Sequence, residues 1–235
     1  MLIRSLADSQ SMQTDQIASL LKPFLKTPLS AQQLAMVSAY LDLLLRWNER
    51  INLTAVRRPE EIVARHFGES FFLAQHLFDP EWNGHVVDVG SGAGFPAVPI
   101  SIYASAAQVT LIERNNKKAT FLRELTRALK MQNVAVYAGR AEEFATDASP
   151  PDVVTLRAVE KFEAAVPVAA SLVRSQAPVM PNGGSSPPVA RRLGLLIGAA
   201  QEESAKRLAP GFKWESPIAT PGSTNRILLV GNLIS

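Results

Sequence analysis

The sequence predicts an α/β fold in which a helical N-terminal segment precedes a mostly parallel, Rossmann-like sheet of seven strands. From residue 84 onward, short β-branched runs alternate with helical patterns, which is typical of parallel strands joined by crossover helices. The first of these runs, residues 85–89, leads into three glycines at alternate positions, a common opening of a nucleotide-binding turn. We therefore divide the 235 residues into a helical extension, 1–83, and a sheet domain, 84–235.

The extension is predicted to contain three helices. A short one covers residues 16–25. A second runs from 31 to 47, because Ser30 and Gln33 have the spacing of a capping box and apolar residues follow at helical period. A third runs from about 59 to 77, where a proline and two glutamates occupy the first turn.

The sheet domain continues the same alternation to the C-terminus. Because two strands follow each other at the end, we expect the last strand to be antiparallel. Residues 175–190 hold four prolines and two glycines, which predicts a flexible loop. The expected strands are 85–89, 108–113, 133–138, 152–156, 193–197, 212–218 and 226–231, and the expected helices are 95–103, 115–131, 160–174 and 199–208.

Composition excludes several kinds of protein. The chain has no cysteine, so disulfides, thiolate metal sites and cysteine nucleophiles are excluded, and its three histidines predict no metal site. No apolar run approaches the ~20 residues of a membrane span, and the N-terminus lacks the pattern of a signal peptide. We expect a cytoplasmic monomer without a metal or a membrane partner.

The glycine turn has a spacing that indicates its ligand. A dinucleotide fingerprint would place glycine at position 95, where this chain has Phe95, so a dehydrogenase is disfavoured. The observed Asp-x-Gly-x-Gly-x-Gly, residues 88–94, resembles motif I of S-adenosylmethionine (SAM) methyltransferases. Glu113 ends the next predicted strand, about 20 residues on, where an acid can bind a ribose diol. We therefore expect Asp88, Gly90, Gly92 and Glu113 to contribute to a SAM site.

Positive charge is concentrated in one segment, although the net charge of the chain is only +3. Such a segment either contacts phosphates or is a solvated helix face, and the sequence leaves both interpretations open. The segment holds Arg114, Lys117, Lys118, Arg123, Arg127 and Lys130 against Glu113 and Glu124.

Residue types also narrow the reaction. Methylation at C5 of a pyrimidine needs a cysteine nucleophile, which is missing. Methylation of an exocyclic amine usually uses an Asn/Asp-Pro-Pro-aromatic motif after the fourth strand, where this chain has Arg157-Ala-Val-Glu. Guanine N7 has a free lone pair and no proton to lose, so holding it in line about 3 Å from a methyl group can supply most of the rate.

These residues together resemble a known family, the bacterial 16S ribosomal RNA guanine-N7 methyltransferases of the RsmG type, also called glucose-inhibited division protein B (GidB). The resemblance covers about residues 35–160 in family order. It implies a class I SAM-dependent methyltransferase fold with an N-terminal helical extension, and a guanine in 16S rRNA of the 30S subunit as substrate. It is carried by Trp47-Asn48, Asn52-Leu-Thr-Ala55, Arg65-His66, Asp88 to Pro96, Lys117-Lys118, Phe121-Leu122, Gly139 to Glu142 and Arg157-Ala158.

Carried over by position, the family's SAM contacts fall on Gly90, Phe95, Ala141, Glu142 and Arg157. Phe95 could instead be a core residue, Glu142 a helix-terminal acid and Arg157 a surface arginine. No catalytic residue is assigned.

On the substrate side, the resemblance implies positioning roles for Asn52, Arg65 and His66, although His66 could equally be a satisfied helix histidine. The expected RNA contacts are Arg46, Arg65, Arg114, Lys117, Lys118 and Arg123.

The chain departs from the family pattern in ways that keep two other functions open. Glu69 stands where aspartate is usual, Ala97 replaces a glycine, and Ile197-Gly198 stands where Lys-Gly is expected, after the proline-rich 175–190 segment. The altered 175–198 region motivates a SAM-binding ribosome assembly factor with weakened catalysis. The other alternative is a small-molecule methyltransferase that uses the N-terminal helices as a lid.

Overall fold

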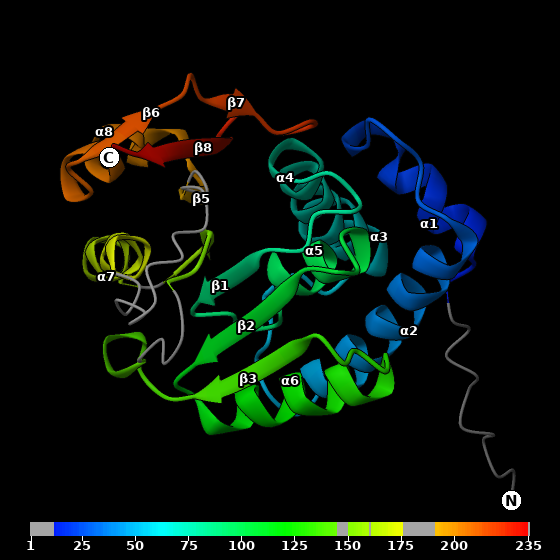
Figure 1. The fold of residues 1–235 in the computed structure, drawn as a ribbon. Coiled ribbons are helices and arrows are strands. Elements are labelled where there is room, and N and C mark those ends of the chain that lie inside the picture. Colours follow the sequence, from blue (N-terminus) through cyan, green and yellow to red (C-terminus); the bar gives the residue numbers. More distant parts are fainter. Residues whose placement is uncertain (1–11, 145–149, 160, 176–190, 235) are drawn as a thin grey trace, which may run out of the picture.

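The computed structural model describes residues 12–144, 150–159, 161–175 and 191–234, which form a sheet covered by helices on both faces (Figure 1). Along the sheet the strand order is β3-β2-β1-β4-β5-β8-β6, and a short β7 pairs with β8. Strands β1 to β5 pair in parallel, whereas β8 is antiparallel to β5 and β6. The strands are β1 (His85–Val89), β2 (Gln108–Glu113), β3 (Val134–Ala138), β4 (Val153–Arg157), β5 (Arg192–Gly198), β6 (Phe212–Trp214), β7 (Ile218–Ala219) and β8 (Arg226–Leu233).

This sheet confirms the predicted fold class, a largely parallel path of seven strands with an antiparallel last strand. One predicted strand, 212–218, is divided into β6 and β7. Pro217 lies in the interruption, and since it has no backbone N–H it cannot donate a ladder hydrogen bond.

Eight α-helices are described, and one of them begins with the predicted capping box. The Ser30 hydroxyl accepts from the Gln33 backbone while the Gln33 side chain accepts from the Ser30 backbone, so the predicted capping box is present. The helices are α1 (Thr14–Leu21), α2 (Ala31–Asn48), α3 (Pro59–Ile62), α4 (Glu69–Leu77), α5 (Ala97–Tyr103), α6 (Asn116–Ala128), α7 (Phe162–Arg174) and α8 (Glu202–Leu208).

Two helical details differ from expectation. The predicted helix 59–77 is interrupted by a π-helical turn, Val63–Gly68, between α3 and α4. The helix after the glycine turn begins at Ala97 rather than at residue 95, three residues after Gly94, whose φ of +93° lies outside the helical region.

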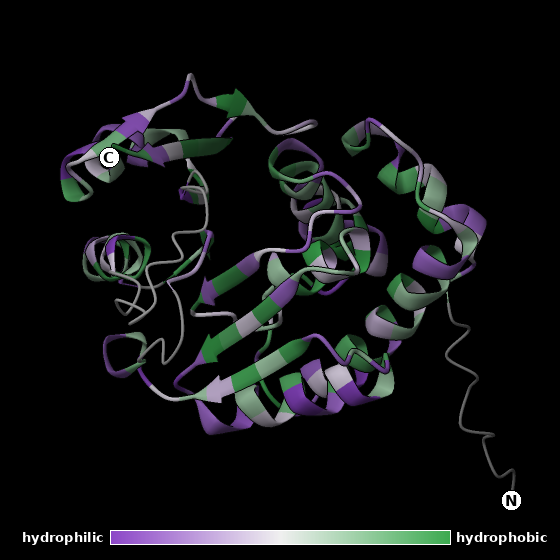
Figure 2. Cartoon of the chain, in the orientation of Figure 1, coloured by the Kyte–Doolittle hydropathy of each residue, from purple (hydrophilic) through white to green (hydrophobic). Residues whose placement is uncertain are grey.

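The core is divided by the sheet into two apolar clusters. Helices α1 to α6 pack on one face in a cluster that includes Tyr40, Phe67 and Phe121, so the N-terminal helices share one core with the sheet domain. Helices α7 and α8 pack on the other face, around Val154 and Leu195. Figure 2 shows this as hydrophobic colour along the central strands and hydrophilic colour along much of α6.

The described helices do not include one that is long and apolar enough to cross a membrane. Within the same residues, no group of three histidine, cysteine or acidic side chains is placed to hold a metal ion. The predicted loop 175–190 lies outside the described residues except for Ser175.

Candidate cofactor and substrate site

The glycine turn after β1 is held against β2 by backbone hydrogen bonds. The N–H groups of Gly90 and Ser91 both donate to the Ile112 carbonyl at 3.0 Å, and Gly94 N–H donates to the Ser91 carbonyl at 2.7 Å. Gly90 and Gly92 have φ of +71° and +56°, the left-handed region that favours glycine. The alternating glycines therefore supply a backbone conformation that other residues adopt only at a cost.

The backbone is open over Gly92 and more crowded over Gly90 and Gly94. A Cβ added at Gly92 would have one described atom within 4 Å, the Gly90 carbonyl oxygen at 3.7 Å, and a Cβ at Gly90 would meet only Val159, at 3.1 Å. A Cβ at Gly94 would meet the Tyr40 hydroxyl at 2.6 Å. The space for a ligand therefore lies over Gly92, while Gly94 makes room for Tyr40.

Glu113 is buried at the end of β2 and accepts a hydrogen bond from the glycine turn. Its Oε2 accepts from Gly92 N–H at 2.9 Å, and its Oε1 accepts from Asn115 N–H at 2.7 Å. Each carboxylate oxygen has a further lone pair, so a diol on the open face can still donate to it. The predicted ribose contact is thus positioned beside the open backbone.

Asp88 is buried in β1, two residues before Gly90. Its Oδ1 accepts from the Thr155 hydroxyl on β4 at 2.7 Å, but Oδ2 has no hydrogen-bond partner among the described residues. Burial raises the pKa of the carboxyl to about 7, and the Thr155 and Ser91 hydrogen bonds oppose that rise. A cationic ligand over the turn would favour the ionised carboxylate.

Arg157, at the end of β4, is tied to the N-terminal helices. Its Nη2 donates to Glu69 Oε2 at 2.8 Å, to the Arg65 carbonyl at 3.0 Å and to His66 Nδ1 at 3.0 Å. The side chains of Arg157 and Glu69 are only 7% and 5% exposed, and Arg226 on β8 reaches the same Glu69 oxygen at 3.3 Å. This is a buried ion pair, so the surface-arginine alternative is wrong for Arg157.

His66 lies in the π-helical turn and is held neutral. Burial together with the charges of Arg157, Arg65 and Arg226 lowers its pKa to about 3. Its Nδ1 accepts from Arg157, so Nε2 carries the proton and donates to the Thr54 hydroxyl at 2.6 Å. At neutral pH this ring is neither an acid nor an effective base, and its positioning role stays a prediction.

Phe95 belongs to an aromatic cluster that joins the turn to the helices. Its ring stacks on Tyr40 at 5.1 Å between centroids and contacts Phe67 edge-on at 5.0 Å. The guanidinium of Arg157 lies 5.8 Å from the same ring, and the Tyr40 hydroxyl donates to the Ala93 carbonyl. Phe95 is 6% exposed, so its core role is established and a cofactor contact stays a prediction.

The predicted residues after β3 lie at the neighbouring strand end. Ala141 and Glu142 form a short 3₁₀ turn, Ala141–Glu143, and Gly139 N–H donates to the Glu113 carbonyl at 3.2 Å. Glu142 is exposed and pairs with Arg140 at 3.6 Å. Since parallel strands end at one edge, Ala141 and Glu142 stay candidates for the adenine side of a nucleotide.

Asn52 lies in a loop organised by Asn48. The Asn48 side chain accepts from Leu53 and Thr54 N–H and donates to the Thr54 carbonyl, which fixes the loop that leads to His66. Asn52 itself is exposed, and its Oδ1 accepts from Arg57 at 3.0 Å.

The predicted RNA contacts are exposed except for the half-buried Lys118, and no hydrogen bond or ion pair among the described residues joins them into one patch. Arg46 is exposed on α2 and Arg65 on the π-helical turn. Arg114 precedes α6, Lys117 and Lys118 begin it, and Arg123 lies in its middle.

Three residues that the sequence did not single out complete the site. Tyr40 lies on the apolar stripe of α2, where a polar hydroxyl was a usable signal. Thr155 and Arg226 had no recognisable sequence signal, because strand pairing across the sheet determines which residues they contact. Arg226 lies opposite Gly198 in the β5–β8 ladder, so it brings a cation to the strand end where Ile197 lacks the expected lysine.

Comparison with known proteins gives a consistent result. The model of the GidB family, described as rRNA small subunit methyltransferase G, matches residues 33–187. A ribosomal RNA small subunit methyltransferase G from Xylella fastidiosa is 40% identical over 149 residues, 63% of this chain and 68% of that protein. One from Exiguobacterium is 44% identical over 137 residues, 57% of each chain.

Solved structures share the fold at low identity. A SAM-dependent methyltransferase from Aquifex aeolicus aligns with a TM-score of 0.50 and 14% identity over 67% of this chain and 91% of that one. A precorrin-6y C5,15-methyltransferase from Geobacter metallireducens aligns with a TM-score of 0.51 and 15% identity over 71% and 87%. These likenesses support the fold class alone.

Proposed function

This chain belongs to the rRNA small subunit methyltransferase G family, and from that membership and the geometry of the site we propose that it methylates N7 of a guanine in 16S rRNA. Membership makes it a SAM-dependent rRNA methyltransferase. We further propose that it acts as a monomer in the cytoplasm on 16S rRNA, free or within the 30S subunit.

The open backbone over Gly92, with Glu113 beside it, is the observation that carries the proposal. When bound there, SAM supplies a methyl group on a positively charged sulfur. Glu113 would accept from the ribose hydroxyls, and the unpartnered Oδ2 of Asp88 would favour the positive charge. Ala141 and Glu142 would flank the adenine. The residues present therefore fit the cofactor.

The substrate side fits a reaction that needs no general base. His66 has its pKa lowered to about 3 and is held by Arg157 and Thr54, so it has little capacity to remove a proton at neutral pH. Bound SAM would supply the methyl group to the guanine N7 lone pair and leave as S-adenosylhomocysteine, and no proton would have to leave N7. Positioning is then the main task of the protein, and Asn52 and Arg65 are the exposed groups that would contact the RNA.

The test is methyl transfer to 30S subunits and to naked 16S rRNA, both from cells that lack this activity, with labelled SAM and nucleoside mass spectrometry. We expect N7-methylguanosine in the RNA. SAM binding without incorporation into either substrate would instead support the assembly-factor alternative. Turnover of a small molecule without RNA would support the small-molecule alternative.

A further inference from the structure

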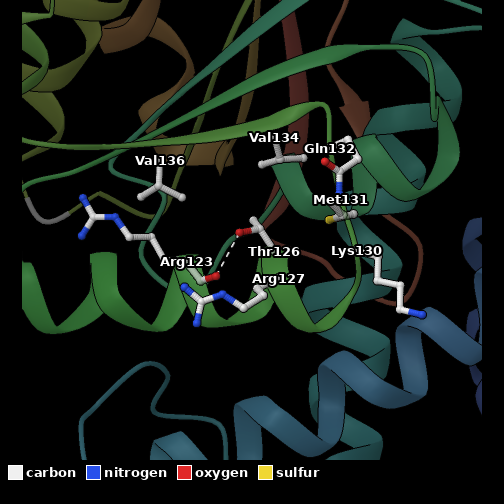
Figure 3. A pocket seen from close by; sticks show the side chains of 8 residues that line it. All are labelled: Arg123, Thr126, Arg127, Lys130, Met131, Gln132, Val134 and Val136. Atoms are coloured by element: carbon white, nitrogen blue, oxygen red, sulfur yellow. Dashed lines mark hydrogen bonds between the residues drawn. The ribbon is translucent and has the colours of Figure 1, made fainter.

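A hollow of about 380 Å³ opens between α6 and the edge strand β3, and no residue of the glycine turn lines it (Figure 3). The hollow lies along the later part of α6, whereas Glu113 and the glycine turn, the proposed cofactor site, adjoin the start of that helix. The lining includes Arg123, Arg127, Lys130, Gln132, Val134 and Val136, and none of the described lining residues is acidic.

The three cations are spread along the hollow. In Figure 3, Arg123 extends toward Val136, Lys130 lies at the end where the chain turns into β3, and Arg127 lies between them. All three are exposed, and no ion pair joins them to another described residue. From Arg123 to the end of α6 at Ala128 the helix rises roughly 7.5 Å, about the length of two nucleotides of one duplex strand, and Lys130 lies two residues beyond.

The segment made of α6 and the two residues after it is strongly basic. Between residues 116 and 130 there are five cations and one acid, a net +4, while the whole chain carries +3. The helix dipole favours Arg127 near the C-terminus, but it disfavours Lys117 and Lys118 in the first turn, which contains no acid. Such an arrangement is favourable when an external anion lies along the helix.

The backbone conformation of Lys130 is a second, independent indication that positive charge matters at this hollow. Its φ of +53° places it in the left-handed region just after the helix, a position where glycine is the usual residue. A lysine there costs roughly 1 kcal/mol of backbone strain. The chain thus keeps a cation at the end of the hollow in spite of that cost.

From these observations we propose that the α6–β3 hollow binds the phosphate backbone of the substrate RNA, as a docking site separate from the cofactor corner. The inference rests on the proposed function, because RNA is the polyanion that this function supplies. Open shape and fixed positive charge suit a polymer backbone, which is bound by electrostatics rather than by sequence. The hollow would add affinity and orientation while the guanine is held some distance away.

The test compares the triple variant Arg123→Gln, Arg127→Gln, Lys130→Gln with a control that removes two exposed cations at the other edge of the sheet, Arg207→Gln with Lys213→Gln. Direct binding of 16S rRNA fragments by fluorescence anisotropy, at several salt concentrations, is measured beside methyl transfer. We expect RNA affinity of the triple variant to fall about tenfold or more and its salt slope to decrease by about 2. The control should behave as wild type.

A charge-preserving variant, Arg123→Lys with Arg127→Lys, should keep most of the affinity, and SAM affinity measured without RNA should be unchanged in every variant. RNA affinity of the triple variant equal to wild type would overturn the docking site and leave a solvated helix face. Because binding is measured directly, a wild-type chain that binds RNA through these cations but transfers no methyl group would refute the proposed function and uphold the docking site. Wild-type protein that binds no RNA would refute both.

Discussion

Two carboxylates at neighbouring strand ends have different environments, and their environments assign their roles. Glu113 has a backbone donor on each oxygen and holds the glycine turn. Asp88 has one oxygen bonded to Thr155 and one without a partner, and burial raises its pKa to about 7. Glu113 is therefore suited to bind hydroxyls, and Asp88 is suited to respond to charge.

The pH dependence of SAM affinity should report Asp88. A cationic ligand favours the ionised carboxylate, so below pH 7 binding must first expel a proton from Asp88. We expect SAM to bind about tenfold more tightly at pH 8 than at pH 6, measured by calorimetry. Asp88→Asn should lose this dependence, and adenosine, which lacks the cationic part, should not show it in wild type. An equal dependence for adenosine would contradict the role of Asp88.

Gly92 should be needed for the cofactor more than for the fold. In Gly92→Ala the added Cβ would lie on the open face, and a φ of +56° would cost roughly 1 kcal/mol of stability. Gly222 is a matched control, with φ of +70° and no described atom within 4 Å of an added Cβ. We expect both alanine variants to lose similar stability in urea unfolding, while only Gly92→Ala loses SAM affinity, by tenfold or more. Equal SAM affinity in the two variants would show that the ligand lies elsewhere.

At the scale of elements, hydrogen bonds and ion pairs between segments far apart in the chain assemble the site. The π-helical turn Val63–Gly68 presents His66 and the Arg65 carbonyl to Arg157 at the end of β4. Such turns often mark functional sites. Glu69, the first residue of α4, then joins Arg157 and Arg226, so one carboxylate links a helix to two strands.

Removing the charge of Glu69 should be costly because its partner is buried. Glu69→Gln would leave the Arg157 guanidinium without its counter-ion at a site where burial already lowers the guanidinium pKa. We expect a loss of about 3–5 kcal/mol in the free energy of unfolding. Glu69→Asp keeps the charge on a shorter arm and should lose less. A loss below 1 kcal/mol for Glu69→Gln would mean that water replaces the pair.

At the scale of the whole molecule, two buried groups affect stability with opposite dependence on pH. The folded chain protonates Asp88 near pH 7 and an unfolded one near 3.8, so this contribution is full below pH 3.8 and is lost as pH rises to 7. His66 has a pKa of about 3 when folded and 6.5 when unfolded, so its contribution is full above pH 6.5 and is lost as pH falls toward 3. Between pH 4 and 6.5 the two effects should nearly cancel.

Variants that remove one of the two groups should reveal the pH dependence of stability that the other group contributes. Relative to wild type, we expect the stability of Asp88→Asn to rise with pH, and that of His66→Gln to fall with pH, by at most about 1.4 kcal/mol per pH unit between pH 4.5 and 6.5. Urea unfolding at several pH values measures this, and the double variant should return to the wild-type slope. Parallel pH profiles for both single variants would contradict the assignment.

Much of the architecture could be predicted because it depends on local pattern. Hydrophobic period located the parallel strands and most helices, and the capping box at Ser30 was readable because its two partners are three residues apart. The glycine spacing with Glu113 indicated the cofactor site, since those residues lie within one βαβ unit. The division of residues 212–218 and the late start of α5 were missed because backbone dihedrals and edge pairing decide them.

The fold class, the glycine turn and the family follow from residues that are close together in the chain. Which ionisable groups face each other depends on how distant segments pack. Arg226 reaches Glu69 from 157 residues away, and Thr155 reaches Asp88 from 67 away. The pKa of a buried group depends on such neighbours and on loss of water, and neither is encoded by spacing along the chain. That is why the neutral His66 and the proton-binding Asp88 became visible only in the folded molecule.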